Sequence, residues 1–124
     1  MKQVLIVDDS QTVRHEIARA LSEAGFAPVE AVDGEAGLAL AREHKFSLII
    51  LDVNMPRMNG LEMLEHLWLD WATANVPVVI LTTEAEGPMI ERARKAGAKG
   101  WLIKPVTTAH IVSTVVAVTE RAKT

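Results

Sequence analysis

Residues 48–60 read LIILDVNMPRMNG, and this stretch decides how the rest of the chain is interpreted. A short apolar run over 48–51 ends at Asp52, and Pro56 and Gly60 follow closely. The run predicts a buried strand, and a carboxylate at the end of such a strand is costly unless it is paired, hydrated or bound to a metal. Asp52 is therefore either a solvated turn residue or a deliberately placed reactive group.

The composition is typical of a compact protein that functions in water. Of the 124 residues, 49% are hydrophobic and 23% are charged, and we predict one domain over 1–124 that buries roughly two-thirds of its surface. Cysteine is absent from the sequence, which excludes disulfides, thiolate metal sites and a cysteine nucleophile. The net charge of −3 argues against nucleic acid as the main partner. The first apolar stretch is too short for a signal peptide or membrane span, so we expect a cytoplasmic protein without membrane insertion.

Short apolar runs alternate with segments of helical period. The runs are strand-length, and they cover residues 4–7, 27–32, 47–51, 76–81 and 100–103. The helical segments cover residues 11–24, 34–44, 60–72, 88–96 and 108–122. This alternation predicts an α/β fold of the (βα)5 type, with a parallel sheet covered by helices on both faces. Because the runs are continuously apolar, we expect strands that are buried on both sides.

Several helix ends can be recognised in the sequence. Ser10 is a suitable N-cap for the first helix and Gly25 a suitable stop. Asp33 and Thr107 precede two other helical segments, and Pro88 suits a first helical position. These signals support the predicted order of elements.

Polar residues follow four of the five predicted strands. They are Asp8, Asp9 and Ser10 after the first strand, Asp52 after the third, Thr82, Thr83 and Glu84 after the fourth, and Lys104 and Pro105 after the fifth. Taken singly, an aspartate after a strand is usually a turn former or a helix N-cap. Parallel strands, however, bring their carboxyl ends to one edge, where ligands bind in such sheets. The shared edge therefore favours a functional site.

Three carboxylates at one edge require a cation. Two carboxylates about 4 Å apart repel by about 4 kcal/mol at an effective dielectric of about 20, while a whole domain is stable by only about 5–15 kcal/mol. Oxygen ligands suit Mg²⁺ or Mn²⁺. A carboxylate beside such an ion, with a lysine and a hydroxyl nearby, can attack phosphorus and form an aspartyl-phosphate. Asp52 is the predicted nucleophile because it stands alone at its strand end, whereas the adjacent Asp8 and Asp9 are typical of metal ligands.

The pattern resembles the receiver domain of two-component response regulators, the CheY-like family, over essentially the whole chain. The motifs that carry the resemblance are Asp8–Asp9, Asp52, Met55–Pro56 with Gly60, Thr82, and Lys104–Pro105. The resemblance implies a doubly wound, flavodoxin-like parallel sheet of five strands in the order 2-1-3-4-5. It also implies a phosphoryl-accepting protein, not a turnover enzyme.

The resemblance assigns a role to each acidic residue. Asp52 would accept the phosphoryl group from a histidine kinase. Asp9, Asp52 and the backbone carbonyl of Asn54 would ligate Mg²⁺, and Asp8 would act largely through water.

The resemblance also implies a switch. Lys104 would pair with the phosphoryl group, and Thr82 would turn inward to donate a hydrogen bond to it. Trp101 stands where the family usually has an aromatic residue that moves with that threonine. The surface that changes would comprise the fourth helix, the fifth strand and the fifth helix.

The downstream partner is inferred from the same resemblance. The stretches TTE at 82–84 and GWLIKP at 100–105 look most like those of stand-alone chemotaxis regulators. A flagellar motor switch component is then the expected target. A phosphorelay shuttle, a phosphate sink or the receiver part of a larger regulator are the alternatives.

Some residues depart from the family pattern or are ambiguous. Thr83 stands where a smaller residue is common, and Val106 stands where Phe is common. Trp68 and Trp71 lie at the end of the third predicted helix, where their spacing favours the core over an interface.

Two other protein classes share this fold or chemistry. An aspartate-nucleophile phosphatase needs a second acid two residues after the nucleophile, where this chain has Asn54. A flavin-binding electron carrier needs a phosphate-binding loop after the first strand, where Asp8 and Asp9 would repel phosphate. Sustained turnover of a phosphate ester would favour the first class, and a yellow protein the second.

Overall fold

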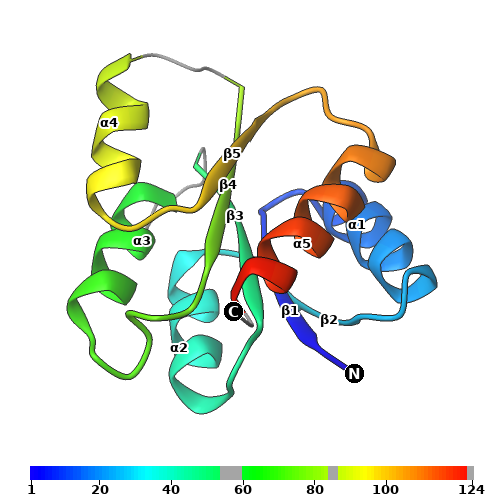
Figure 1. Cartoon of the computed structure of the whole chain (residues 1–124), viewed down its shortest axis with the longest axis horizontal. Coiled ribbons are helices and arrows are strands. Elements are labelled where there is room, and N and C mark those ends of the chain that lie inside the picture. Colours follow the sequence, from blue (N-terminus) through cyan, green and yellow to red (C-terminus); the bar gives the residue numbers. More distant parts are fainter. Residues whose placement is uncertain (54–59, 84–86, 123–124) are drawn as a thin grey trace.

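Strands and helices alternate along the chain in the computed structural model, which describes residues 1–53, 60–83 and 87–122 (Figure 1). The strands are β1 (Gln3–Val7), β2 (Ala27–Ala31), β3 (Leu48–Asp52), β4 (Val78–Thr82) and β5 (Gly100–Ile103). The helices are α1 (Gln11–Glu23), α2 (Gly34–Glu43), α3 (Gly60–Leu69), α4 (Gly87–Lys95) and α5 (Thr108–Ala122). Every predicted element is present, and the largest difference in a boundary is at the end of α3.

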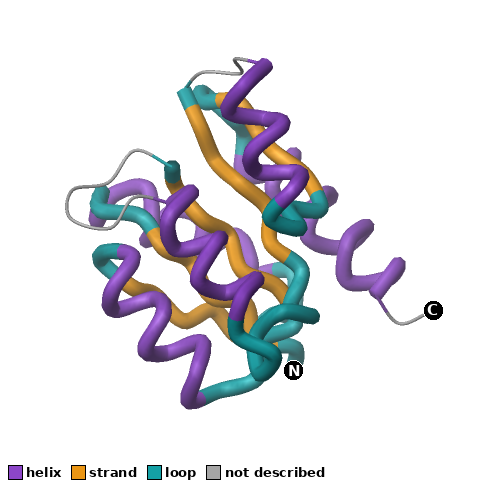
Figure 2. The backbone as a smooth tube through the Cα atoms, turned by 90° about the vertical axis from the view of Figure 1, so that its left-hand side faces the viewer, coloured by secondary structure: helices purple, strands orange, loops and turns teal. Residues whose placement is uncertain are grey.

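The five described strands form one parallel sheet in the order β2-β1-β3-β4-β5. This confirms the predicted fold class and strand order. Figure 1 shows α1 and α5 on one face of the sheet and α2, α3 and α4 on the other. Figure 2, seen from the side of α2, α3 and α4, shows the strands behind these helices. The strand order reverses between β1 and β3, so the binding edge predicted for such sheets lies at their carboxyl ends.

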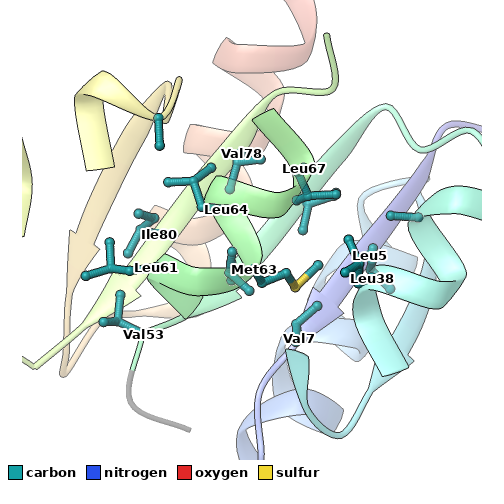
Figure 3. Close-up of a cluster of buried hydrophobic side chains, with 14 of the residues drawn as sticks. Leu5, Val7, Leu38, Val53, Leu61, Met63, Leu64, Leu67, Val78 and Ile80 are labelled. Atoms are coloured by element: carbon teal, nitrogen blue, oxygen red, sulfur yellow. The ribbon is translucent and has the colours of Figure 1, made fainter. Parts of the chain in front are cut away.

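Each face of the sheet has its own apolar core. On one face, α2 and α3 pack on β1, β3 and β4, and Met63 extends from α3 towards Leu38 and Val7 (Figure 3). On the other face, α1 and α5 pack through residues that include Ile17 and Ile111. The central strands β1, β3 and β4 are almost entirely buried, as expected for a sheet covered on both faces. The edge strands β2 and β5 are only partly buried, so the prediction of burial on both sides is wrong for them.

Three helices begin where the sequence predicts. The side chains of Ser10, Asp33 and Thr107 each accept a hydrogen bond from the backbone N–H of the residue three positions later, at 3.3, 2.8 and 3.1 Å. These caps satisfy N–H groups that the first helical turn leaves without partners. At the other end of α1, Gly25 follows the helix with a φ of 92°, a conformation that favours glycine. α4 begins at Gly87, so Pro88 is its second residue and not its first.

Helix α3 ends three residues earlier than predicted, and this overturns the expectation that Trp68 and Trp71 belong to the core. The side chain of Trp68 is half exposed, and Trp71 is 89% exposed. The physical reason is a local stop signal: the buried Thr73 hydroxyl donates a hydrogen bond of 2.8 Å to the carbonyl of Leu67. Asp70 adds a turn by accepting the N–H of Ala72 at 3.0 Å. Trp71 therefore lies in a surface turn.

Within residues 1–53, 60–83 and 87–122, no helix has both the length and the apolar character that a membrane crossing requires.

Candidate functional site

Three carboxylates come together at the carboxyl edge of the sheet. Asp8 and Asp9 directly follow β1, and Asp52 is the last residue of β3. One oxygen from each carboxylate lies within 4.8 Å of the other two. Asp8 and Asp52 are buried and Asp9 is exposed, so the cluster opens to solvent on the side of Asp9. The three carboxylates that were predicted to meet at this edge of the sheet therefore do lie together.

Backbone hydrogen bonds fix Asp8. Its N–H donates to the carbonyl of Ala31 at 3.2 Å, which extends the pairing of β1 with β2 by one residue. Its Oδ1 accepts the N–H of Ser10 at 2.8 Å. Ser10 is also the N-cap of α1. The hydrogen bond therefore ties the Asp8 carboxylate to the first turn of that helix.

Asp52 is held by the strand that ends with it. Asp52 lies opposite Leu81 in the register of β3 and β4, and the residue is only 2% exposed. Gly60, the first residue of α3, lies directly against the backbone of Asp52, and a Cβ at that position would collide with the Asp52 carbonyl. The N–H of Gly60 donates to the carbonyl of Val53 at 3.2 Å. Only glycine allows α3 to begin this close to the end of β3.

Lys104 supplies the cation that the carboxylate cluster needs. Its Nζ lies 3.3 Å from Oδ2 of Asp8 and 3.4 Å from Oδ1 of Asp52. Its own N–H donates to the carbonyl of Thr82 at 2.7 Å, which continues the pairing of β5 with β4. The Lys104–Pro105 peptide bond is cis. One ammonium group thus lies between two buried carboxylates, and a third carboxylate adjoins them, so the cluster of described charges remains anionic.

The residues predicted to form the switch lie on neighbouring strands. Thr82 is buried at the end of β4, one residue beyond the position that pairs with Asp52. Trp101 lies on the edge strand β5 opposite Ile80, and its side chain is 39% exposed. Thr83 is exposed, and Val106 packs against the core that α1 and α5 share. The predicted residues Asn54, Met55, Pro56 and Glu84 lie outside the described residues.

Sequence reasoning missed Arg14, which reaches the site from α1. The guanidinium is buried, and its Nη1 donates a hydrogen bond of 2.7 Å to the backbone carbonyl of Asp8. Its Nε donates to Oε1 of Glu30 on β2 at 3.2 Å. The available signal was its position, because Arg14 shares the buried stripe of α1 with Ile17 and Leu21. A charged residue on an apolar stripe requires a partner in the core.

The donor set of the cluster fits a hard divalent cation. All of its ligand atoms are carboxylate oxygens, as Mg²⁺ and Mn²⁺ prefer. A partly open site suits Mg²⁺ because this ion usually keeps several water ligands. The exposure of Asp9 beside the two buried carboxylates provides that opening. Asp8, Asp9 and Asp52 could therefore hold the ion, and Lys104 lies where it can contact an anion bound at Asp52.

Comparisons with known proteins agree with this geometry. The family model described as the response regulator receiver domain matches residues 4–116. Protein PilH of Pseudomonas aeruginosa is 34% identical over 118 residues, which cover 95% of this chain and 98% of PilH. The solved structure of the chemotaxis response regulator CheY4 of Vibrio cholerae is similar at a TM-score of 0.89 and 36% identity, over 95% of this chain and 98% of CheY4.

A further relative is longer than this chain. The transcriptional regulatory protein PdtaR of Mycobacterium tuberculosis is 36% identical over 113 residues, which are 90% of this chain and 53% of PdtaR. The chain therefore spans about half the length of that relative.

Proposed function

The chain belongs to the response regulator receiver domain family, and from this premise we propose that it is a phosphoryl-accepting switch with Asp52 as the acceptor. The observation that carries the proposal is the position of Asp52, which is buried at the end of β3 with Lys104 Nζ at 3.4 Å. A lone buried aspartate would be a liability, whereas an aspartate beside an ammonium group, and beside carboxylates that could hold a divalent cation, can accept a phosphoryl anion. The family match also favours this function over the phosphatase and flavin alternatives.

The proposed reaction is phosphoryl transfer from a histidine kinase. One oxygen of Asp52 forms a bond to phosphorus while the bond between phosphorus and the donor histidine nitrogen breaks, and that nitrogen keeps the electron pair of the broken bond. Lys104 pairs with the incoming phosphoryl oxygens. Mg²⁺ or Mn²⁺, when bound, offsets negative charge on those oxygens. Asp8, Asp9 and Asp52 would hold the ion, together with the carbonyl of Asn54. The protein in this scheme is a phosphoacceptor and not a turnover enzyme.

We further propose that the signal leaves through the surface of α4, β5 and α5. Trp101 and Ile103 are both partly exposed, and they project from the same side of edge strand β5 because they are two residues apart. Inverting a population of 1:99 requires about 5.5 kcal/mol, and a hydrogen bond to a charged group supplies only about 1.5–3 kcal/mol. Thr82 therefore acts together with Lys104 in coupling the phosphoryl group to Trp101.

The downstream partner is proposed to be a protein. CheY-3 of Vibrio cholerae, a chemotaxis protein by name, is 34% identical over 110 residues, which supports a role in chemotaxis. A flagellar motor switch component is the target that we propose for such a role. A phosphorelay shuttle or a phosphate sink is the alternative. The length of PdtaR keeps a third alternative open, in which the chain is the receiver part of a larger regulator.

Intact-mass measurement tests the phosphoacceptor assignment. The protein is incubated with Mg²⁺ and acetyl phosphate, and the mass is recorded at neutral pH. We expect one labile phosphoryl adduct that is absent from Asp52→Asn and from a sample treated with a chelator. Asp33→Asn is the matched control, because Asp33 also follows a strand but caps α2, and Asn is an equally good N-cap. An adduct on Asp52→Asn, or none on a wild-type protein that binds Mg²⁺, would contradict the assignment.

A second variant tests the coupling. Thr82→Ala is expected to accept the phosphoryl group while failing to change the fluorescence emission of Trp101. A Trp68→Phe, Trp71→Phe background isolates the emission of Trp101, because the sequence contains only these three tryptophans. A full change in emission from phosphorylated Thr82→Ala would refute the role of Thr82.

A further inference from the structure

A cavity of about 450 Å³ adjoins the carboxylate cluster, on the face of the sheet where Figure 1 shows α1 and α5. Its most buried lining residues are Ile17 of α1, Leu81 of β4 and Ile111 of α5, which are at most 2% exposed. Val13 and Val106 also line it and are partly buried. Cavities that bind small molecules have volumes of about 300–1,000 Å³ and are lined mainly by apolar side chains. We name this one the α1–α5 cavity.

The α1–α5 cavity lies beside Asp52. Leu81, which lines the cavity, pairs with Asp52 in the register of β3 and β4. Leu81 and Ile50 belong to the core on the side of α1 and α5, and side chains two residues apart on a strand share a face. The Asp52 side chain therefore projects on the same face as Leu81. Lys104 is a second link, because it lines the cavity while its Nζ lies 3.4 Å from Oδ1 of Asp52.

The charged lining residues restrict what the cavity accepts. Glu16 is an exposed lining residue on α1, and Lys104 is the cationic one. The ammonium group of Lys104 already contacts the carboxylates of Asp8 and Asp52, so its charge acts on the cluster. The Glu16 carboxylate would repel a second anionic group. The cavity therefore favours a neutral apolar group, and an anion attached to that group would lie at Lys104 and Asp52.

We infer that the α1–α5 cavity binds the apolar acyl group of a small acyl phosphate that donates its phosphoryl group to Asp52. The inference rests on the proposed function of Asp52 and names a class of donor for it. One oxygen of Asp52 forms a bond to phosphorus while the bond between phosphorus and the acyl oxygen breaks. The carboxylate that leaves keeps the electron pair of the broken bond.

The size of the cavity favours a small donor. A cavity of about 150 Å³ is sufficient to bind benzene, so the α1–α5 cavity has room for a six-membered ring. The attacking and leaving oxygens lie roughly in line on opposite sides of phosphorus. The acyl group therefore begins on the solvent side of the phosphoryl group and bends into the cavity past Lys104, whereas the phosphoryl group stays at Asp52.

A comparison of two donors tests this inference on the full chain. Acetyl phosphate and cyclohexanecarbonyl phosphate release carboxylates of nearly equal basicity, so a difference in their rates reports binding of the acyl group. Phosphorylation is followed by intact mass in Mg²⁺ at equal, low donor concentrations. We expect the cyclohexanecarbonyl donor to react at least about tenfold faster, because each added methylene group in a hydrophobic pocket contributes about tenfold or more. Neither donor should label Asp52→Asn.

Variants that fill the cavity locate the binding site. Val106→Phe and Val13→Phe place a larger side chain in it from different elements, and each should reduce the ratio of the two rates to below about threefold. The ratio within one variant cancels any effect on the chemistry at Asp52 itself. Val112→Phe is the matched control, since Val112 packs against the same core but is not among the residues that line the cavity. It should keep the tenfold ratio.

Several results would overturn the inference. Equal rates of the two donors on wild type would do so and leave the proposed function intact, whereas no label from either donor on a protein that binds Mg²⁺ would refute the proposed function itself. A tenfold ratio that persists in both Val106→Phe and Val13→Phe would place the acyl group elsewhere. Equal rates, with transfer from a phosphorylated histidine kinase slowed in both variants, would identify a side chain of a protein donor as the occupant.

Discussion

The carboxylate cluster and the surface between α3 and α4 both contain ion pairs, but they differ in what surrounds the charges. Lys104, with a 24% exposed side chain, contacts the carboxylates of Asp8 and Asp52, whose side chains are at most 3% exposed. Arg92 and Glu65 are paired at a shorter distance, yet their side chains are 47% and 41% exposed. Distance alone would rank the pair of Arg92 and Glu65 as the stronger one. Burial reverses that ranking, because water screens the exposed pair and hardly reaches the buried carboxylates.

This difference separates two uses of charge in one small fold. At the sheet edge, the charges depend on one another, so removing or adding a cation changes the energy of the whole cluster. At the surface between α3 and α4, water screens each charge, so one charge depends little on the next. The first arrangement suits the chemistry proposed at Asp52, and the second contributes little to the stability of the fold.

The largest expected effect is on the free energy of unfolding when the buried cation is removed. In metal-free buffer with a chelator, Lys104→Met should destabilise the protein by about 3 kcal/mol, because two buried carboxylates lose their cation. Arg92→Met should cost less than about 1 kcal/mol, because the pair is exposed. Urea unfolding measures both values. Saturating Mg²⁺ should reduce the loss in Lys104→Met, since the ion replaces the missing charge. Equal losses in the two variants would show that burial does not distinguish the two regions.

The backbone beside each region offers a second comparison. Gly60→Ala places a methyl group against the carbonyl of Asp52, so we expect a loss of about 1–3 kcal/mol and weaker Mg²⁺ binding. Gly87→Ala is the matched control at the start of α4, where an added Cβ meets nothing within 4 Å. It should be neutral or stabilising by up to about 1 kcal/mol. Urea unfolding and Mg²⁺ titration measure both effects. Equal free energies of unfolding and equal Mg²⁺ affinities in Gly60→Ala and Gly87→Ala would contradict the close contact between Gly60 and the Asp52 carbonyl.

A variant of Arg14 tests whether the hydrogen bonds of this residue help to hold the carboxylate cluster in place. Arg14→Lys cannot keep the bonds to both the Asp8 carbonyl and Glu30, so we expect a loss of about 1.5 kcal/mol and reduced Mg²⁺ affinity. Arg19→Lys is the control on the same helix, because Arg19 pairs with Glu23 at the surface. That change should cost no more than about 0.5 kcal/mol. An unchanged Mg²⁺ affinity in Arg14→Lys would mean that Arg14 stabilises the fold but does not help to position the carboxylates for the ion.

The residues that sequence reasoning placed correctly at the edge of the sheet share one physical origin. Asp8 and Lys104 directly follow strands and Asp52 ends one, and a parallel sheet brings strand ends to one edge whatever the details of packing. The alternation of apolar runs and helical segments was sufficient to predict that sheet. Their mutual distances could not be predicted, because the register of each strand pair is set by long-range contacts.

The residues that sequence reasoning missed or misplaced depend on contacts between distant elements. Arg14 reaches the cluster from a helix face, and its partner Glu30 lies on another strand. Trp71 was expected in the core because the helical period continues past Leu69, whereas the Thr73 hydroxyl ends the helix by binding a carbonyl six residues earlier. Side-chain capping at a C-terminus has a weaker sequence signature than the Ser, Thr and Asp caps that mark helix starts.

The smallest expected effect concerns the pair of Arg92 and Glu65, and how its contribution to the free energy of unfolding depends on pH. The hydrogen bond from Arg92 holds the pKa of Glu65 below its ordinary value of 4.5. A carboxyl group with a lowered pKa stabilises the fold above its ordinary pKa, and this contribution disappears as the pH falls through the lowered value. Glu65→Gln should therefore destabilise the protein by no more than about 0.5 kcal/mol near neutral pH, because the pair is exposed. The difference between wild type and variant should shrink towards zero as the pH falls through the lowered pKa of Glu65.

A double-mutant cycle shows whether Arg92 is the cause. In an Arg92→Gln background, Glu65→Gln should cost almost nothing at any pH, because the interaction is already lost. Urea unfolding of all four proteins between about pH 3 and 7 gives the coupling energy at each pH. A coupling that stays constant as the pH falls through the lowered pKa of Glu65 would mean that Glu65 and Arg92 stabilise the fold through packing. The contrast with the buried carboxylates would then rest on the charges of those carboxylates alone.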